Sequence, residues 1–476
     1  MRKLVACAAL CLLVDSANAA NLADVYQAAL QNDPVLGAAK DTYFARKEAV
    51  PQARSALLPL ANASGYTAWN ERDYPNAKIA NPAPPPATFG IPDDNYNEHT
   101  WQAGLTQPIF HADSYFNYQG AKSRVKGADF DYQSSQQNLI VRVVQAYLDI
   151  LRAQAAVESS QAEEDAVRRQ LEQVQQRFDV GLVAITDVLD AKAAYDNAAV
   201  VRIQAQGDQN IFFETLSTLT GSRYNEIDRL AENLPIRDPD PVDAEAWVKL
   251  ALDTNLNVKS AREQVDAARE DLRARESGHL PTVDAIASYN QYRSDAFGFL
   301  SPTTGGTISD RTNTAVYRLA FSLPIYQGGY TQSRVREARE LVLQSEDNLR
   351  NREWSVKRDT YNLVSAVSTD VVRVSARIRA IKSSESALEA TQTGYEVGTR
   401  NIVDVLQAQQ RLYLSQFDYA DSRYKYVNDL LFLKLTAGTL NDDDLNRLNA
   451  YSEPSKPVVR IAKPGPIAPD NGTTAH

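Results

Sequence analysis

Two nine-residue stretches decide the architecture of this chain, because the second repeats the first. Residues 181–189 read GLVAITDVL, and residues 398–406 read GTRNIVDVL, 217 positions later. Two shorter motifs recur at nearly the same offset: QPIF at 107–110 as LPIY at 323–326, and LPL at 58–60 as LPT at 280–282. Three ordered matches indicate a duplicated chain. We expect one structural repeat over 21–235 and a second over 243–452.

Proline chemistry marks the segments outside the repeats. Residues 238–241 read DPDP, which favours neither helix nor sheet, so 236–242 is predicted to be a linker. Residues 453–476 contain five prolines and few apolar side chains. We expect a disordered C-terminal tail there.

Each repeat contains one very long helix. Residues 113–178 and 327–395 contain no proline, and their apolar residues recur at spacings of three and four. A helix of about 66 residues is about 100 Å long, far beyond the usual helix of a globular domain. Further helices are expected over 186–221 and 401–438, which carry wide apolar seams. A two-stranded coiled coil is the simplest reading, but wide seams in both repeats favour a larger helical assembly.

Four shorter segments alternate apolar and polar residues. They lie near 58–70, 99–109, 281–292 and 314–325. Alternation over about ten residues is typical of a transmembrane β-strand, although a half-buried soluble sheet gives the same pattern. Four strands are too few to close a barrel, which takes about eight. We expect several copies of the chain to share one barrel, and this pattern does not choose between two copies and three.

The N-terminus has the features of an export signal. Arg2 and Lys3 precede an apolar run over 4–14, and small residues follow up to Ala20. The run is too short to span a bilayer, so residues 1–20 are predicted to be a removed signal peptide. The two cysteines of the chain lie inside this segment, which leaves the mature chain without thiol chemistry.

Composition excludes several classes of function. The chain has 50 Lys+Arg against 60 Asp+Glu, a net charge of −10, and its four His are dispersed. Nucleic-acid binding requires clustered basic residues, and zinc sites require clustered His and Cys. The sequence contains no phosphate-binding loop or nucleophile motif. We therefore expect no enzyme, no metal, no cofactor and no nucleic-acid partner.

Several longer motifs carry a resemblance to a known family. They are residues 21–26, 177–178, 180–188, 278–281, 322–329 and 394–400. Together they span nearly the whole mature chain, which resembles the TolC family of outer-membrane efflux and secretion channels. The resemblance implies a mixed α and β fold. In it a homotrimer forms a 12-stranded barrel in outer-membrane lipid, continued by a periplasmic α-helical coiled-coil barrel.

The resemblance also implies a function and a location. The chain would be the passive exit duct of a tripartite efflux pump, a type I protein secretion system or both, in a Gram-negative bacterium. A periplasmic adaptor and an inner-membrane transporter, either an efflux pump or an ABC exporter, would open its periplasmic end. Drug efflux and protein secretion both stay open, and a periplasmic coiled-coil scaffold without a pore is the alternative.

The turns that follow the long helices are the candidate gate. By resemblance, Tyr395 and Arg400 of the second turn bind Asp187 and Thr186 of the first, within one copy or between copies. A bond from Arg400 to Asp187 would be charge-assisted and Tyr395 would add a phenolic donor. An acidic residue near a helix N-terminus can also be only a favourable dipole partner.

Two further sets of residues follow from the resemblance. Asp404 and Gln407 would face the lumen as a selectivity ring, and an acidic ring favours cations. Gln407 departs from the family pattern, so three carboxylates are expected rather than six, while Asp190 would lie outside the lumen. The expected adaptor-docking turns are Val180, Gly181, Leu182, Val397, Gly398 and Thr399. Glycine at these turns is also a common helix C-cap.

Overall fold

The structure is a computed structural model that describes residues 19–73, 78–80, 88–90, 94–294, 311–461 and 463. It divides into two compact units. Unit 1 comprises Met1–Tyr43, Asp129–Ser260 and Arg350–His476. Unit 2 comprises Phe44–Ala128 and Ala261–Leu349. The export signal predicted over 1–20 lies, up to residue 18, outside the described residues.

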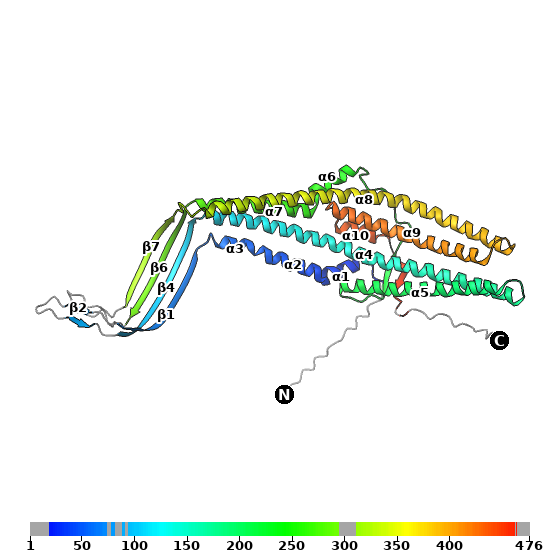
Figure 1. The fold of residues 1–476 in the computed structure, drawn as a ribbon, viewed down its shortest axis with the longest axis horizontal. Coiled ribbons are helices and arrows are strands. Elements are labelled where there is room, and N and C mark those ends of the chain that lie inside the picture. Colours follow the sequence, from blue (N-terminus) through cyan, green and yellow to red (C-terminus); the bar gives the residue numbers. More distant parts are fainter. Residues whose placement is uncertain are drawn as a thin grey trace, which may run out of the picture. The chain divides into compact units, whose positions relative to one another are not determined.

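Unit 2 contains a four-stranded antiparallel sheet (Figure 1). Its strands, in spatial order, are β1 (Leu60–Arg72), β4 (Asp94–Phe110), β6 (Thr282–Ser294) and β7 (Thr312–Ser322). β2 (Lys78–Ala80) and β3 (Thr88–Gly90) form a separate pair. α3 (Ala49–Ser55) and a 3₁₀ turn (Ser277–His279) precede β1 and β6. β7 ends at Ser322, before Pro324, although a strand up to residue 325 was expected.

Strand register places most of the large apolar residues of β7 and their partners on one face. Leu105 pairs with Ala287, which pairs with Tyr317, and Val283 pairs with Phe321. Directly paired residues point to the same side of a sheet, so the alternating patterns of separate strands join into one apolar face. Its side chains are solvent-accessible in the single chain: Tyr317, for example, is 82% exposed.

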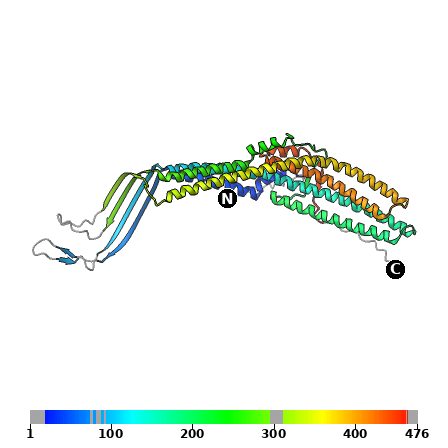
Figure 2. The same cartoon turned by 45° about the horizontal axis from the view of Figure 1, so that its top comes forward.

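Two long helical hairpins build most of unit 1. The first joins α4 (Ala112–Asp179) to α5 (Ile185–Thr220), and the second joins α8 (Tyr330–Glu396) to α9 (Ile402–Thr436). In both Figure 1 and Figure 2, α9 lies between α8 and α4 within this unit. A hydrogen bond from Ser159 Oγ to the Tyr413 carbonyl, 2.7 Å, joins α4 to α9.

Shorter helices open each repeat. They are α1 (Leu22–Asn32), α2 (Pro34–Lys47), α6 (Ala244–Thr254) and α7 (Leu256–Glu276), and α10 (Asp442–Asn449) follows α9. Asn21 and Asp243 cap α1 and α6 by accepting backbone N–H bonds. α8 begins at Tyr330 rather than at residue 327, because Gly328 and Gly329 adopt positive φ angles of 61° and 84° that break the helix.

The predicted disordered tail over 453–476 is wrong for its first part. β8 (Ser452–Val459) pairs with β5 (Glu226–Leu230) in unit 1. The prolines at 454 and 457 argued against a strand, but proline is tolerated on an edge strand, where one side needs no N–H donor. β5 and β8 are more than 200 positions apart, so no local pattern signals their pairing. Residues 464–476 lie outside the described residues.

Among the described residues, no helix is both long and apolar enough to cross a bilayer.

Candidate functional site at the two hairpin turns

Both hairpin turns use the same backbone motif. In the first, Leu182 N–H donates to the Arg177 carbonyl and Gly181 N–H to the Phe178 carbonyl, both 2.8 Å. In the second, Thr399 N–H donates to the Gly394 carbonyl at 2.8 Å and Gly398 N–H to the Tyr395 carbonyl at 3.1 Å. This is the Schellman helix ending, which needs a left-handed residue. Glycine supplies it at both turns, with φ of 79° at Gly181 and 78° at Gly398.

The helices that leave the turns are capped differently. Asn401 caps α9: its side chain accepts a hydrogen bond of 2.8 Å from Asp404 N–H. Ala184 occupies the equivalent position before α5 and makes no side-chain cap. The backbone of the two turns is therefore repeated, while the side-chain support of the second turn is stronger.

One apolar cluster holds the ends of the two hairpins together. Its buried residues come from α4, α5 and α9: Val167, Val174, Val188, Ala191, Ile402, Val405 and Leu406. Phe178 of the first turn and Tyr395 of the second pack against it. Burial of this cluster explains why the turns, 217 positions apart in the sequence, lie together in one unit.

Arg177 and Tyr395 form a contact between the two hairpin ends. The Arg177 guanidinium lies over the Tyr395 ring, 5.1 Å from its centroid, which is cation–π geometry. The Tyr395 hydroxyl is buried and makes no hydrogen bond within the described part of the chain. Burial raises the pKa of Tyr395, the nearby charge of Arg177 lowers it, and the negative charge of Asp187 adds to the rise. Tyr395 thus lies between a cation and a carboxylate.

The predicted bond from Arg400 to Asp187 is not formed within the single chain. Arg400 Nη1 lies 3.7 Å from Asp404 Oδ2, one helical turn ahead on its own hairpin. Among the described residues, no hydrogen bond or ion pair joins Asp187 to Arg400 or Tyr395. Thr186 is exposed at the start of α5. The single chain therefore leaves Asp187 and Thr186 available to another molecule.

Sequence reasoning gave no role to Arg177. Its repeat equivalent is Gly394, where a Cβ atom would come within 2.8 Å of Arg400 Cγ. The two repeats therefore differ at this position for a steric reason. The difference between Arg177 and Gly394 is the one feature of the sequence that marks this position. It does not reveal that the Arg177 side chain reaches Tyr395.

The candidate ring residues lie on the first turns of α9. Asp404 is partly exposed, and Gln407 is exposed and accepts a 3.4 Å hydrogen bond from Arg411 Nη2. Asp190, the repeat equivalent of Gln407, is exposed on α5. No group of three or more potential metal ligands occurs among the described residues.

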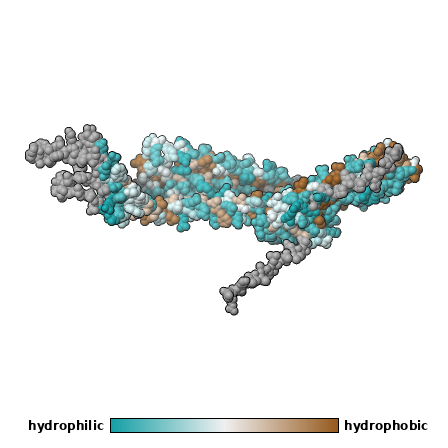
Figure 3. All heavy atoms as spheres, turned by 90° about the horizontal axis from the view of Figure 1, so that it is seen from below, coloured by the Kyte–Doolittle hydropathy of each residue, from teal (hydrophilic) through white to brown (hydrophobic). Residues whose placement is uncertain are grey.

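The candidate docking turns expose apolar side chains. Val180, Leu182 and Val397 are each 69% exposed. Apolar surface gathers at this end of the hairpins in Figure 3. Isolated exposed apolar residues are common, but a group of them on two adjacent turns is typical of a contact surface.

With this geometry in hand, comparison with known proteins assigns the family. The outer membrane efflux protein family matches residues 25–222 and 247–439. This chain belongs to the outer membrane efflux protein family. It is 35% identical over 455 residues to the outer membrane protein TolC of Escherichia coli (strain K12), covering 95% of this chain and 88% of that protein. It is 28% identical over 449 residues to the alkaline protease secretion protein AprF of Pseudomonas aeruginosa, covering 93% and 89%.

Solved structures with low identity show the same fold. The outer membrane protein VceC of Vibrio cholerae has a TM-score of 0.72 and 18% identity, over 88% of this chain and 96% of that one. The two segments matched by the family correspond to the two predicted repeats. The predicted fold class, long helices with a small four-stranded sheet in a duplicated chain, is confirmed.

Family membership also confirms the predicted location and class of function. This chain is an outer-membrane protein of the kind found in Gram-negative bacteria. It belongs to the channels that serve efflux and type I secretion. The names of its relatives describe outer-membrane, efflux and secretion proteins.

Proposed function

We propose that three copies of this chain form one duct through the outer membrane, with their strands closed into a single barrel and their helices continued as a periplasmic tunnel. The sheet of unit 2 carries this proposal. Within the described residues, β1 and β7 each pair on one side only. An open sheet edge in lipid would leave backbone groups without hydrogen bonds, so β1 of one copy must pair with β7 of the next.

The apolar face of the sheet supports a lipid environment. Exposed aromatic side chains such as Tyr317 and Phe321 lie on this face. The charged residues Asp284 and Arg318 lie on the opposite face of the sheet. Two copies would give eight strands, a barrel filled by side chains, whereas three give twelve strands and a lumen. A duct therefore requires at least three copies, the number that the family resemblance implies.

The hairpin turns would form the periplasmic gate. Arg177 holds Tyr395 within each copy, while Asp187 and Thr186 receive Arg400 from a neighbouring copy. Each contact is partly exposed and therefore weak, and three symmetric copies add up to a closed state that a partner can open. A partner opens the gate only if it binds the open state better than the closed one.

Asp404 and Gln407 would line the narrow end of the lumen. Three Asp404 carboxylates on a threefold axis attract cations, and Gln407 adds no charge to them. We expect Asp404→Ala to reduce the cation preference of the open pore, measured as the reversal potential under a salt gradient. An unchanged reversal potential would remove Asp404 from the lumen.

A periplasmic adaptor would dock on the exposed turns around Gly181 and Gly398. The adaptor would link the duct to an inner-membrane transporter, either an efflux pump or an ABC exporter. The duct is passive in this scheme, so the transporter determines whether small molecules or proteins are exported.

Single-channel conductance in a planar bilayer tests the duct and its gate together. Wild-type protein is expected to conduct weakly, and Tyr395→Ala/Arg400→Ser to conduct several-fold better, because the first substitution removes the ring that Arg177 contacts and the second removes the cation proposed to reach Asp187. Arg177→Ala should have a smaller effect in the same direction. Arg168→Ala, which removes an exposed ion pair with Asp165 on α4, is the matched control and should conduct like wild type.

Two outcomes contradict the proposal in different ways. Equal conductance in all variants would keep the duct and discard the gate. Folded, inserted protein that never conducts, or a dimer mass in detergent, would discard the duct itself.

A further inference from the structure

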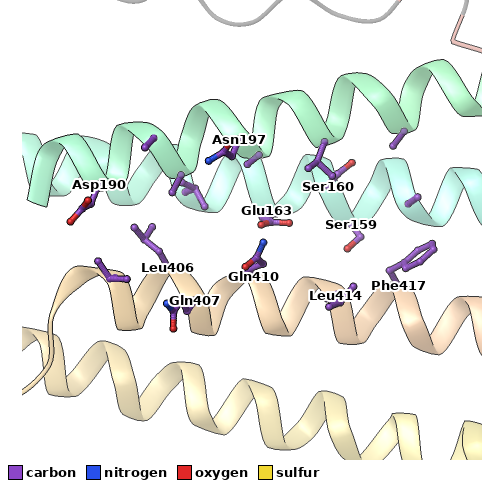
Figure 4. A pocket seen from close by; sticks show the side chains of 18 residues that line it. Ser159, Ser160, Glu163, Asp190, Asn197, Leu406, Gln407, Gln410, Leu414 and Phe417 are labelled. Carbon is purple, nitrogen blue, oxygen red and sulfur yellow. The ribbon is translucent and has the colours of Figure 1, made fainter.

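A groove runs along three helices of unit 1 and begins close to the turns, where Val403 and Gln407 of α9 line it. It lies between α4, α5 and α9 and has a volume of about 590 Å³ (Figure 4). Small side chains of α5, including Ala193, Ala194 and Ala198, leave the space open. Leu414 and Phe417 of α9 form much of the apolar wall. This volume is in the range of small-molecule sites, which are mostly apolar with a few polar groups.

Glu163 of α4 is the charged group at the middle of this groove. Its side chain points into the space that Gln410 enters from the facing helix α9 (Figure 4). Glu163 is partly buried, and burial alone raises the pKa of its carboxyl group. Within the described residues it has neither a hydrogen-bond donor nor an ion-pair partner. A carboxylate held beside apolar walls without a counter-charge is unfavourable until a cation reaches it.

The rest of the groove adds no positive charge. No Lys or Arg is among its described lining residues, and Asp190 contributes a second carboxylate at the end nearer the turns. Ser159, Asn197 and Gln410 supply neutral polar atoms. The groove therefore combines negative charge, apolar area and hydrogen-bonding groups.

We propose that this groove binds organic cations that carry apolar groups, with Glu163 as the counter-ion. The apolar walls would bury the hydrocarbon part of such a molecule, and the carboxylate would lie against its charged centre. A bare metal ion fits poorly, because it requires several oxygen ligands around one point. An apolar helix from another copy of the chain also fits poorly, because it would bury the Glu163 carboxylate without a counter-charge.

The binding site does not depend on the duct proposal, since it is defined within one chain. If the duct proposal holds, Gln407, which is both a groove residue and a candidate ring residue, places the groove beside the lumen. Molecules in transit would then meet the site before they leave the narrow end of the tunnel.

Equilibrium dialysis of the purified full chain in lipid nanodiscs tests the proposal. Tetraphenylphosphonium is the probe, and binding to empty nanodiscs is subtracted. We expect saturable binding to wild type that Glu163→Gln weakens about tenfold, because the variant keeps the shape and removes the charge. Glu172→Gln, an exposed carboxylate on the same helix and outside the groove, should bind like wild type.

Tetraphenylborate separates charge from apolar contact, since it has nearly the same size and shape and the opposite charge. It should show no saturable binding to wild type. Equal affinity of wild type and Glu163→Gln for the cation, or saturable binding of the borate to wild type, would overturn the proposal.

A second measurement tests whether another copy of the chain covers the groove in the assembled protein. Asn197→Cys introduces a thiol into the groove, and a maleimide should label it. An unreactive thiol together with no saturable binding of the cation would mean that another copy fills the groove, which also overturns the proposal.

Discussion

The two helical hairpins end in the same backbone turn, yet they bury opposite combinations of charge. Between α4 and α5, the carboxylate of Glu164 accepts a hydrogen bond from Arg202, and both side chains are buried. Between α8 and α9, Asp370 meets a second carboxyl group, that of Asp429, and the Asp370 side chain is 1% exposed. The buried Glu164 of the first hairpin therefore faces a group of opposite charge, whereas the buried Asp370 of the second faces a group of the same charge.

The surroundings of Asp370 show how a like-charge pair is tolerated. Arg373 Nη1 donates to Asp370 Oδ1 at 2.5 Å, and Lys425 Nζ donates to Asp429 Oδ2 at 2.6 Å. Asp370 Oδ2 has no donor in the described part of the chain. Burial and the neighbouring Asp429 raise the pKa of Asp370 to about 6. With this pKa, the Asp370 carboxyl is protonated at low pH, which removes its repulsion from Asp429, and it loses the proton near neutral pH.

Repeat equivalence shows that each hairpin acquired its charges separately. With the 217-residue offset, Asp370 corresponds to Ala153 and Asp429 to Phe212. Glu164 and Arg202 correspond to Ile381 and Tyr419. The backbone of the duplicated unit was kept, while the buried polar groups diverged. This difference predicts that the first hairpin is the more rigid and the second the more easily displaced.

The largest expected effect is the loss of the opposite-charge pair. Glu164→Ala leaves the buried Arg202 without its carboxylate and should reduce the free energy of unfolding by about 4 kcal/mol. Thermal unfolding followed by far-UV circular dichroism measures it. Asp165→Ala removes a more exposed carboxylate on the same helix and should change stability by less than about 1 kcal/mol. Similar effects of the two substitutions would mean that burial does not distinguish the first hairpin.

In the second hairpin, we expect a substitution to raise the free energy of unfolding, by a smaller amount. The folded-state pKa of Asp370 is raised, so this group favours the folded state at low pH. That advantage is lost as pH rises from about 4 through 6. Asp370→Asn should therefore raise the stability at about pH 7.5 by about 2 kcal/mol and flatten its pH dependence in this window.

Denaturant unfolding at several pH values checks this prediction. Asp359→Asn, an exposed carboxyl group on the same helix, is the control and should follow the wild-type pH profile. Loss of stability in Asp370→Asn at every pH would show that the ionised Asp370 carboxylate stabilises the fold, which contradicts the prediction.

The smallest effect concerns the helix caps after the turns. Asn401→Ala should lower stability by about 1 kcal/mol, and Ala184→Asn should raise it by a similar amount, because the second turn has a side-chain cap and the first has none. Melting temperatures of the two single variants and of the exchanged pair measure the difference. Changes of the same sign in both single variants would refute the capping explanation.

Regular elements of this chain were accessible to sequence reasoning. The long helix predicted over 113–178 is found over Ala112–Asp179, since an uninterrupted apolar period without proline permits little else. The strand predicted near 281–292 is found over Thr282–Ser294, directly after a proline. These patterns are local, and local patterns are visible in a sequence.

Contacts between distant residues were not accessible. Arg177 and Tyr395 are separated by 218 positions, and Asp370 and Asp429 by 59. No periodicity tells which of many exposed-looking polar residues face each other after packing. The pairing of β5 with β8 was missed for the same reason, and proline in β8 argued against it.

The amino-acid order alone specifies the duplication, the lengths of the helices, the alternating strands and the glycine turns, because each shows as a pattern along the chain. Packing settles which charges are buried and which of them meet, that Arg177 contacts Tyr395, and that Arg400 lies near Asp404 rather than Asp187 within one chain. Burial removes the solvent that screens and satisfies polar groups, and burial is a property of packed helices.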